Sequence, residues 1–270
     1  MSVLPKDGFL STILDEWSAE TKKSAQKWFS LINELNIAAV AVLPSLELQR
    51  SAQKEIVAAA LYARALQTFE ASVLLTGRGM LADSETLARS VAETAFFLGG
   101  LAVINNFLVR MAGANNSHFF KLGYASVELL KRENKSLNPD AAELKQFLDE
   151  AKLQGYRENN INLNQLAKEV GMEALYDTVY RQLSGNAAHP SVASSERHIM
   201  RGIGGNVENL IFKPQRNGVE KALSVALFAF LSALEAIGVI FKRADIQTTV
   251  ELYNIRHQAL SNELSSRAGQ

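Results

Sequence analysis

The sequence has no cysteine and only five prolines in 270 residues. The lack of cysteine excludes disulfide bonds, thiolate nucleophiles and zinc sites with cysteine ligands, and it suits a reducing cytosol. The scarcity of proline leaves long stretches in which nothing interrupts a helix. We therefore expect a cytoplasmic, mainly helical protein.

Net charge is absent as well, because 28 Lys and Arg residues balance 28 Asp and Glu residues. No overall field attracts the chain to nucleic acid or to an anionic membrane, although a local basic patch stays open. Residues 1–17 lack the basic start and apolar run of a signal peptide. We expect a single helical domain over residues 1–270, with 1–50 as a peripheral N-terminal helix and 245–270 as a C-terminal helix and tail.

Long apolar runs are absent except at residues 222–241, where Glu235 is the only charged residue. The run is long enough to span a membrane. Lys221 lies before it and Lys242 and Arg243 follow it, so the flanking charge shows no strong asymmetry. A helix that is apolar on all sides is usually the centre of a large bundle. We predict a buried core helix and no membrane span.

Apolar residues recur at helical spacing through most of the remaining chain. Breaks are expected at Pro44, at the Gly77-Arg78-Gly79 turn, at Asn105-Asn106 and at Gly171. The predicted helices span residues 6–42, 45–77, 85–104, 107–134, 139–154, 162 or 164 to 171, 173–183, 218–244 and 245–264, with Asp83 or Ser84 as the cap of the third. A break of the fourth helix at residues 113–116 is left open.

Residues 191–217 depart from this pattern, because Ser, Gly, Asn and charged residues dominate them. Within them, residues 198–203 and 207–212 flank Gly204-Gly205-Asn206, a hairpin-turn signature. We predict an all-α, multi-helix bundle with a small β-hairpin or irregular insertion near residues 198–212.

Familiar catalytic signatures are missing. The sequence has no phosphate-binding Walker loop, no dinucleotide glycine fingerprint, no H-E-x-x-H and no G-x-S-x-G. The four histidines are scattered, and none has a carboxylate three residues before it, as di-iron bundles require. We therefore predict no metal and no cofactor, and leave open whether the protein is an enzyme.

Glu85, Arg89 and Glu93 recur every four residues and so share one helix face. The neighbouring residues are apolar, which places this ladder at the edge of the core or inside it. It is an exposed salt-bridge ladder, a buried structural network, or an arginine held between two carboxylates facing a pocket.

A second group follows in residues 176–190. Tyr176, Tyr180 and Ser184 lie about one turn apart, Arg181 follows Tyr180, and His189 comes just after the expected helix end. His189 either caps free carbonyls or acts as a general acid or base, because imidazole titrates near neutral pH. In the second case Ser184 or Tyr180 orients it, and Arg181 or Arg89 binds an anion such as phosphate.

Two further features bear on this group. Glu235 needs a partner if it is buried, and Arg89 and His189 are the candidates. A locally basic loop follows, with Arg197, His198, Arg201, Lys213 and Arg216 against Glu196 and Glu208. It is either a solvated charged loop or a contact for a nucleic-acid backbone.

Together, the two groups resemble a bacterial family of helical domains of unknown function. Its pattern is G-x-x-x-x-A-x-x-L-x-R-S-x-x-E, followed much later by Y-x-x-L-S-x-x-x-x-H. This chain matches at Gly79, Leu87, Arg89, Ser90, Glu93, Tyr180, Leu183, Ser184 and His189, and has Ser84 in place of the alanine. The resemblance spans roughly residues 55–245.

A more distant resemblance is to HEPN domains, helical bundles found in toxin–antitoxin and phage-defence systems. Their ribonucleases use an Arg and a His a few residues apart, whereas Arg181 and His189 lie farther apart here. This resemblance implies a ribonuclease or defence effector using His189 and Arg181, with RNA or a phosphorylated ligand as its partner. The residues themselves favour a non-catalytic binding or scaffold module with a polar cluster in the bundle. Long helices with apolar stripes often pair, so we expect a homo-oligomer, most simply a dimer.

Overall fold

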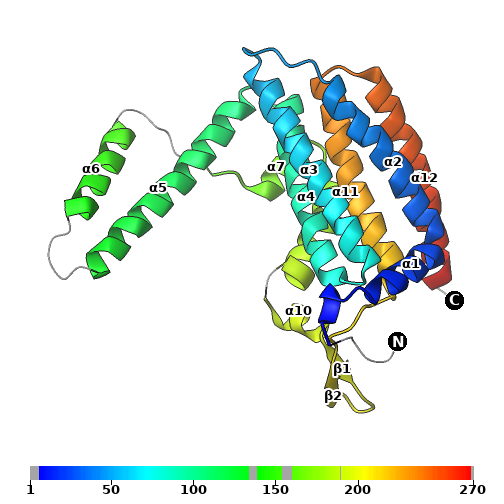
Figure 1. Cartoon of the computed structure of the whole chain (residues 1–270). Helices are drawn as coiled ribbons and strands as arrows, with labels where there is room; N and C mark the ends of the chain where they lie inside the picture. Colours follow the sequence, from blue (N-terminus) through cyan, green and yellow to red (C-terminus); the bar gives the residue numbers. More distant parts are fainter. Residues whose placement is uncertain (1–5, 134–138, 154–159, 189, 269–270) are drawn as a thin grey trace. The chain divides into compact units, whose positions relative to one another are not determined.

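The computed structural model describes residues 6–133, 139–153, 160–188 and 190–268. These residues form helices and one two-stranded sheet (Figure 1). The prediction of an all-α bundle with a small hairpin is confirmed. The chain divides into two compact units. One contains the described residues up to 103 and from 167 onward, and the other contains those from 104 to 166. The single-domain expectation stays a prediction.

The first unit is a bundle of long helices around α11. Its helices are α1 (Leu14–Ser24), α2 (Gln26–Ser45), α3 (Gln53–Gly77), α4 (Leu81–Val103), α11 (Val219–Ile240) and α12 (Ala244–Ala268), preceded by the 3₁₀ turn η1 (Gly8–Leu10). Helix α11 contacts α2, α3, α4 and α12, which lie side by side in Figure 1. It is therefore the central element of this unit.

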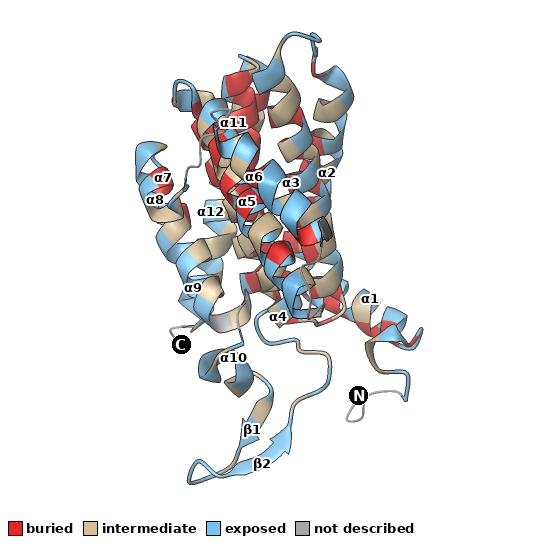
Figure 2. Cartoon of the chain, turned by 90° about the vertical axis from the view of Figure 1, so that its left-hand side faces the viewer, coloured by how far each residue is buried: buried red, intermediate tan, exposed pale blue. Residues whose placement is uncertain are grey.

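The core follows from the composition of α11. Fourteen of its 22 residues are buried, as the red positions of Figure 2 illustrate. Phe230 of α11 stacks on Phe69 of α3, with ring centroids 4.5 Å apart and planes 8° from parallel. The predicted core helix over residues 222–241 is therefore buried by its neighbours. Glu235, the one acidic residue within 222–241, is exposed.

Among the residues that the structure describes, three helices are long and apolar enough to cross a membrane by length and composition alone: α2, α4 and α11. In α11, 72% of the apolar window is buried inside the protein, against 28% in α2.

Several helix ends differ from the prediction. The first predicted helix is broken at Ala25, which divides it into α1 and α2, and α2 runs one residue past Pro44. Helix α4 begins at Leu81, so Ser84 is not its cap. The Ser84 hydroxyl is buried and lies 2.6 Å from that of Thr76 and 3.0 Å from that of Ser72, both on α3. Its hydrogen-bonding capacity is used between helices.

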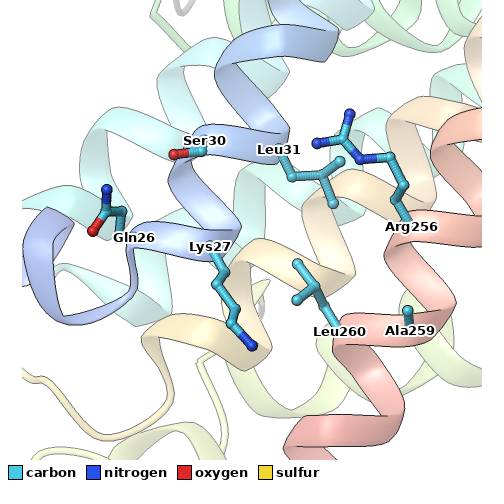
Figure 3. A pocket seen from close by; sticks show the side chains of 7 residues that line it. All are labelled: Gln26, Lys27, Ser30, Leu31, Arg256, Ala259 and Leu260. Carbon is cyan, nitrogen blue, oxygen red and sulfur yellow. The ribbon is translucent and has the colours of Figure 1, made fainter.

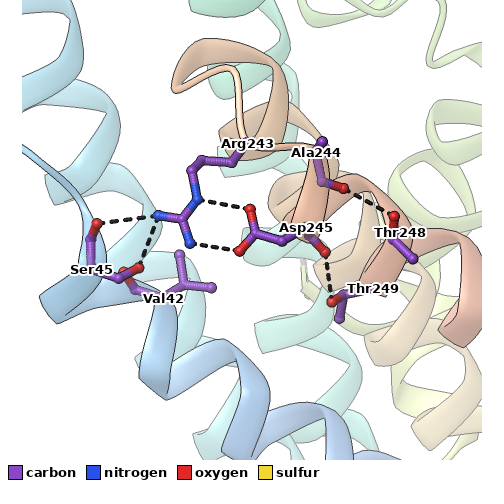
Figure 4. A network of polar contacts seen from close by, with 7 residues as sticks. All are labelled: Val42, Ser45, Arg243, Ala244, Asp245, Thr248 and Thr249. Atoms are coloured by element: carbon purple, nitrogen blue, oxygen red, sulfur yellow. Dashed lines mark hydrogen bonds and ion pairs between the residues drawn. The ribbon is translucent and has the colours of Figure 1, made fainter.

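The predicted helix over residues 45–77 begins only at Gln53. Figure 4 shows a reason for the end of α2: Arg243 donates to the carbonyl and the hydroxyl of Ser45, at 3.2 and 3.1 Å. The same guanidinium pairs with Asp245 at the start of α12 and lowers the pKa of that carboxyl to about 2. One arginine thus ties the end of α2 to the start of α12.

The second unit contains α5 (Phe107–Glu133) and α6 (Pro139–Leu153). Helix α5 has no interruption at residues 113–116, and the expected break before it is present, where Asn106 is left-handed (φ 59°). A small cluster of buried side chains joins the two helices: Phe120, Val127, Ala141 and Leu148. The Tyr124 hydroxyl also donates to Asp149 at 2.8 Å.

The segment between the long helices is built from short pieces: α7 (Leu163–Glu169), α8 (Glu173–Leu175), the π turn η2 (Tyr176–Tyr180), α9 (Arg181–Leu183), the π turn η3 (Ser184–Ala188) and α10 (Val192–Glu196). The predicted helix over 173–183 therefore stays helical to Ala188 and includes two π turns. Strands β1 (Ile199–Arg201) and β2 (Val207–Leu210) then pair antiparallel. Gly204 and Gly205 supply the positive φ angles of their turn.

Candidate functional site

Helix α4 carries the predicted ladder and packs against the two π turns. Its residue Arg89 lies at the centre of the contact, with a side chain that is 15% exposed. Nε of Arg89 donates to the Ser184 hydroxyl at 2.8 Å, and Nη2 donates to the Tyr180 hydroxyl at 3.0 Å. Nη2 also lies 2.9 Å from the Glu93 carboxylate. We call Arg89, Glu93, Tyr180 and Ser184 the Arg89 cluster.

The hydroxyl of Ser184 is oriented by a further bond. It donates to the backbone carbonyl of Tyr180 at 2.7 Å, which leaves its oxygen free to accept from Arg89. The Arg89 guanidinium carbon also lies 4.7 Å from the centroid of the Tyr180 ring, within cation–π range. Charge, hydrogen bonds and ring contact therefore hold the arginine in one position.

Two further aromatic rings contact the Tyr180 ring of the cluster. The Tyr180 ring stacks on Tyr176 with centroids 5.2 Å apart, and meets Phe96 of α4 edge-on at 6.0 Å. Burying an arginine beside apolar rings is costly unless its donors are satisfied. The hydroxyls of Tyr180 and Ser184 satisfy two of them.

Glu85, the first acid of the ladder, has a different partner. Its carboxylate lies 2.5 Å from Arg197, which follows α10, and the two side chains are 12% and 24% exposed. Arg89 is thus held by one carboxylate, that of Glu93, and the interpretation of an arginine between two carboxylates is wrong. The Glu85–Arg197 pair joins the segment that follows α10 to the face of α4 that carries Arg89.

The remaining predicted site residues are not brought into the cluster. The Arg181 side chain is 62% exposed and pairs with Asp177 at 3.1 Å, one turn earlier. Glu235 is exposed on α11, where its backbone carbonyl accepts from Gln247 of α12. The expectation that Glu235 joins the polar cluster is therefore wrong, because that face of α11 is turned to solvent. His189 lies outside the described residues.

Residues 55–206 match a family model described as a family of unknown function, DUF5677. The match covers more than half of the 270-residue chain. The chain belongs to the DUF5677 family. No curated protein and no solved structure matches it. The matched region contains the whole Arg89 cluster and the Glu85–Arg197 pair, so this contact is built from the part of the chain that defines the family.

The basic loop of this DUF5677 protein is largely neutralised within the chain. Arg197 pairs with Glu85, Arg201 with Glu196, and Arg216 with Glu20 at 2.5 Å. An arginine already paired with a carboxylate has its charge largely balanced and attracts a phosphate less strongly. The pairings therefore favour a charged loop that stabilises its own surroundings over a nucleic-acid contact.

A second polar group lies outside the DUF5677 match and was missed from the sequence. His257 of α12 has its Nε2 atom 2.9 Å from the Ser224 hydroxyl of α11 and 3.3 Å from that of Ser261. The Phe228 ring lies parallel to the imidazole at 6.1 Å, and Trp28 of α2 meets it edge-on at 5.9 Å. Burial lowers the pKa of His257 below its usual value. Only the spacing of His257 and Ser261 was visible in the sequence, because Ser224 lies on another helix.

A shallow pocket of about 480 Å³ lies between α2 and α12 (Figure 3). Its lining contains two cations, Lys27 and Arg256. Lys27 pairs with Glu263 at 2.6 Å, and Arg256 pairs with Glu34 at 2.7 Å. Both charges are matched by the protein's own acids, which leaves an anionic ligand little to gain. Within the described residues, no group of three or more His, Asp or Glu side chains is placed to hold a metal ion.

Proposed function

We propose that this DUF5677 protein is a non-catalytic binding or scaffold module of the cytoplasm, in which the Arg89 cluster is structural. The observation that carries the proposal is the engagement of Arg89 with its own chain. Its Nε and Nη2 atoms bind Ser184, Tyr180 and Glu93, and its side chain is 15% exposed. An arginine used in this way holds the π turns on α4, and two of its three guanidinium nitrogens are engaged within the chain.

The hairpin that follows is the part that such a scaffold presents. The Glu85–Arg197 pair fixes the end of α10 to α4, directly before β1. Beyond it, Ile203 is fully exposed at the turn, and Leu210 is 70% exposed. Ile203 lies at the turn and Leu210 at the far end of the strands, so exposed apolar side chains extend along the hairpin, as on a contact surface. The hairpin therefore provides the surface on which a partner would bind.

The alternative is a HEPN-like ribonuclease that acts in toxin–antitoxin or phage-defence systems through His189 and Arg181. This alternative rests on sequence resemblance. Arg181 is bound to Asp177 in solvent, and the basic loop beyond it is internally paired. These contacts favour the structural interpretation.

The first test compares two arginines in thermal unfolding. Arg89→Lys keeps the charge but removes the fork that reaches Ser184 and Tyr180 together, so we expect a loss of roughly 1–3 kcal/mol of stability. Arg181→Lys is the matched control, because an exposed pair contributes about 0–1 kcal/mol. Equal melting temperatures for wild type and Arg89→Lys would contradict a structural role.

The second test addresses catalysis directly. Purified wild type and His189→Ala are incubated with single-stranded and structured RNA, and the products are resolved by electrophoresis. The scaffold proposal predicts no cleavage by either protein. Cleavage by wild type that disappears in His189→Ala would replace the proposal with the ribonuclease.

A further inference from the structure

The second unit has a small core and a large exposed apolar surface. Its two helices bury the cluster of Phe120, Val127, Ala141 and Leu148 between them. Four other large apolar side chains of the same unit are about half exposed: Phe119 47%, Leu122 55%, Leu129 56% and Phe147 55%. We call these four the apolar face. A two-helix unit with so few buried side chains gains much from covering such a surface.

The apolar face is continuous across both helices. On α5, Phe119, Leu122 and Leu129 follow the three- and seven-residue spacing of one helix side. On α6, Phe147 lies beside Phe119, because these two side chains line one groove of about 350 Å³. Spacing of this kind is typical of a helix seam that packs against other helices.

Charged residues border the apolar face, with opposite signs on its two sides. At 100° per residue, the stripe on α5 starts at Phe119 beside α6 and ends at Leu129, farther round the helix. Arg132 and Lys121 follow roughly 60° and 80° beyond Leu129, and both are exposed. Glu128 on this border is already paired with Lys131 at 2.8 Å. The α5 border is therefore basic.

The α6 border is acidic. Glu143 and Glu150 lie four residues before and three residues after Phe147, and both are exposed. The whole helices show the same difference. Helix α5 has four Lys and Arg residues against two acids, and α6 has two against four.

We infer that the apolar face binds the same face of a second copy of this chain, about a two-fold axis parallel to the α5–α6 hairpin. This operation places α5 of one copy against α6 of the other. The four apolar residues of each copy then meet in the centre, and each basic border meets an acidic border. The product is an antiparallel four-helix bundle with a self-complementary interface. Because its two borders have opposite charge, the face is complementary to itself, and this favours a second copy as the occupant.

Charge reversal tests the inference. Lys121→Glu with Arg132→Glu makes both borders acidic, and Glu143→Lys with Glu150→Lys makes both basic. Light scattering coupled to gel filtration of the full chain should show a wild-type dimer, and each double variant should dissociate at roughly tenfold higher concentration or more. The quadruple variant restores opposite signs and should dimerise again. A mixture of the two double variants should form heterodimers.

The control is Lys23→Glu with Lys54→Glu, an equal change of charge at exposed positions of α1 and α3. It should leave the dimer intact. A chain that is monomeric at all concentrations overturns the inference, as do double variants that dimerise like the wild type. Restored assembly in the quadruple variant and in the mixture cannot result from misfolding. Neither outcome depends on the scaffold proposal, which concerns the Arg89 cluster.

Discussion

At the scale of single residues, this protein depends on polar side chains whose partners come from distant parts of the chain. Arg89 binds Tyr180 and Ser184, which follow it by 91 and 95 residues. His257 binds Ser224, which precedes it by 33 residues. In both cases a group that is costly to bury is satisfied across a helix interface. Such side chains fix which helices pack together.

His257 should make stability depend on pH near neutrality. Because burial lowers its pKa, the folded protein binds this proton less readily than the unfolded chain. The contribution of His257 to the free energy of unfolding is complete above the ordinary histidine pKa of 6.5. It is lost as the pH falls from there through the pKa of His257 in the folded protein. We expect the melting temperature of wild type to fall between about pH 7.5 and about pH 5.5, and that of His257→Gln to fall less.

Glutamine is the control of choice because it can still bond to Ser224 but does not titrate. Carboxyls with lowered pKa values, such as Glu34 and Glu263, titrate below their ordinary value of 4.5 and affect both proteins equally. If the melting temperatures of the two proteins change equally with pH over this range, His257 does not cause the pH dependence.

At the scale of elements, the turn between α3 and α4 determines how the ladder-bearing helix starts. Gly79 has φ +74°, and its carbonyl accepts from Gln215 at 3.1 Å. A Cβ at this position would lie 2.5 Å from the Trp17 ring and 2.7 Å from the Gln215 nitrogen. The turn therefore needs glycine both for its left-handed backbone and for close packing against α1 and the segment before α11.

Gly171 has the first of these requirements, a left-handed backbone, but not the second, close packing. It has φ +71°, and a Cβ there would meet no atom within 4 Å. Gly171→Ala should cost only the left-handed strain, roughly 1–2 kcal/mol, whereas Gly79→Ala should cost about 1–3 kcal/mol more through overpacking. Denaturant unfolding of both variants measures the difference. Losses of equal size would show that the contacts of Gly79 relax without cost.

At the scale of the whole molecule, the apolar character of α11 is explained by its central place in the bundle. Its side chains pack on α3 and α4, and Phe230 stacks on both Phe69 and Tyr62. The same composition makes α2, α4 and α11 long and apolar enough for a membrane. Burial inside the protein and burial in lipid satisfy the same apolar surface.

Cell fractionation distinguishes these two environments. If α11 is covered by its own bundle, the chain expressed without detergent should stay in the supernatant after ultracentrifugation. Any fraction adsorbed to membranes should be released by an alkaline wash, since no apolar helix is inserted. A chain that resists the wash and dissolves only in detergent would place these helices in the membrane.

The sequence by itself determined the helices and the hairpin, because both depend on preferences that act over a few residues. Helical spacing of apolar residues identified α5, α6 and α11, and Gly204-Gly205-Asn206 identified the hairpin. The same spacing placed Glu85, Arg89 and Glu93 on one face.

Only the tertiary structure decided what those residues contact. Ser84 bonds to α3 instead of capping α4, Glu85 pairs with Arg197 instead of Arg89, and Glu235 faces solvent. The physical reason is that a hydrogen bond or an ion pair forms with whichever group packing brings within about 3 Å. Local propensity sets the direction of a side chain on its helix, but the packing of the other helices sets what it meets.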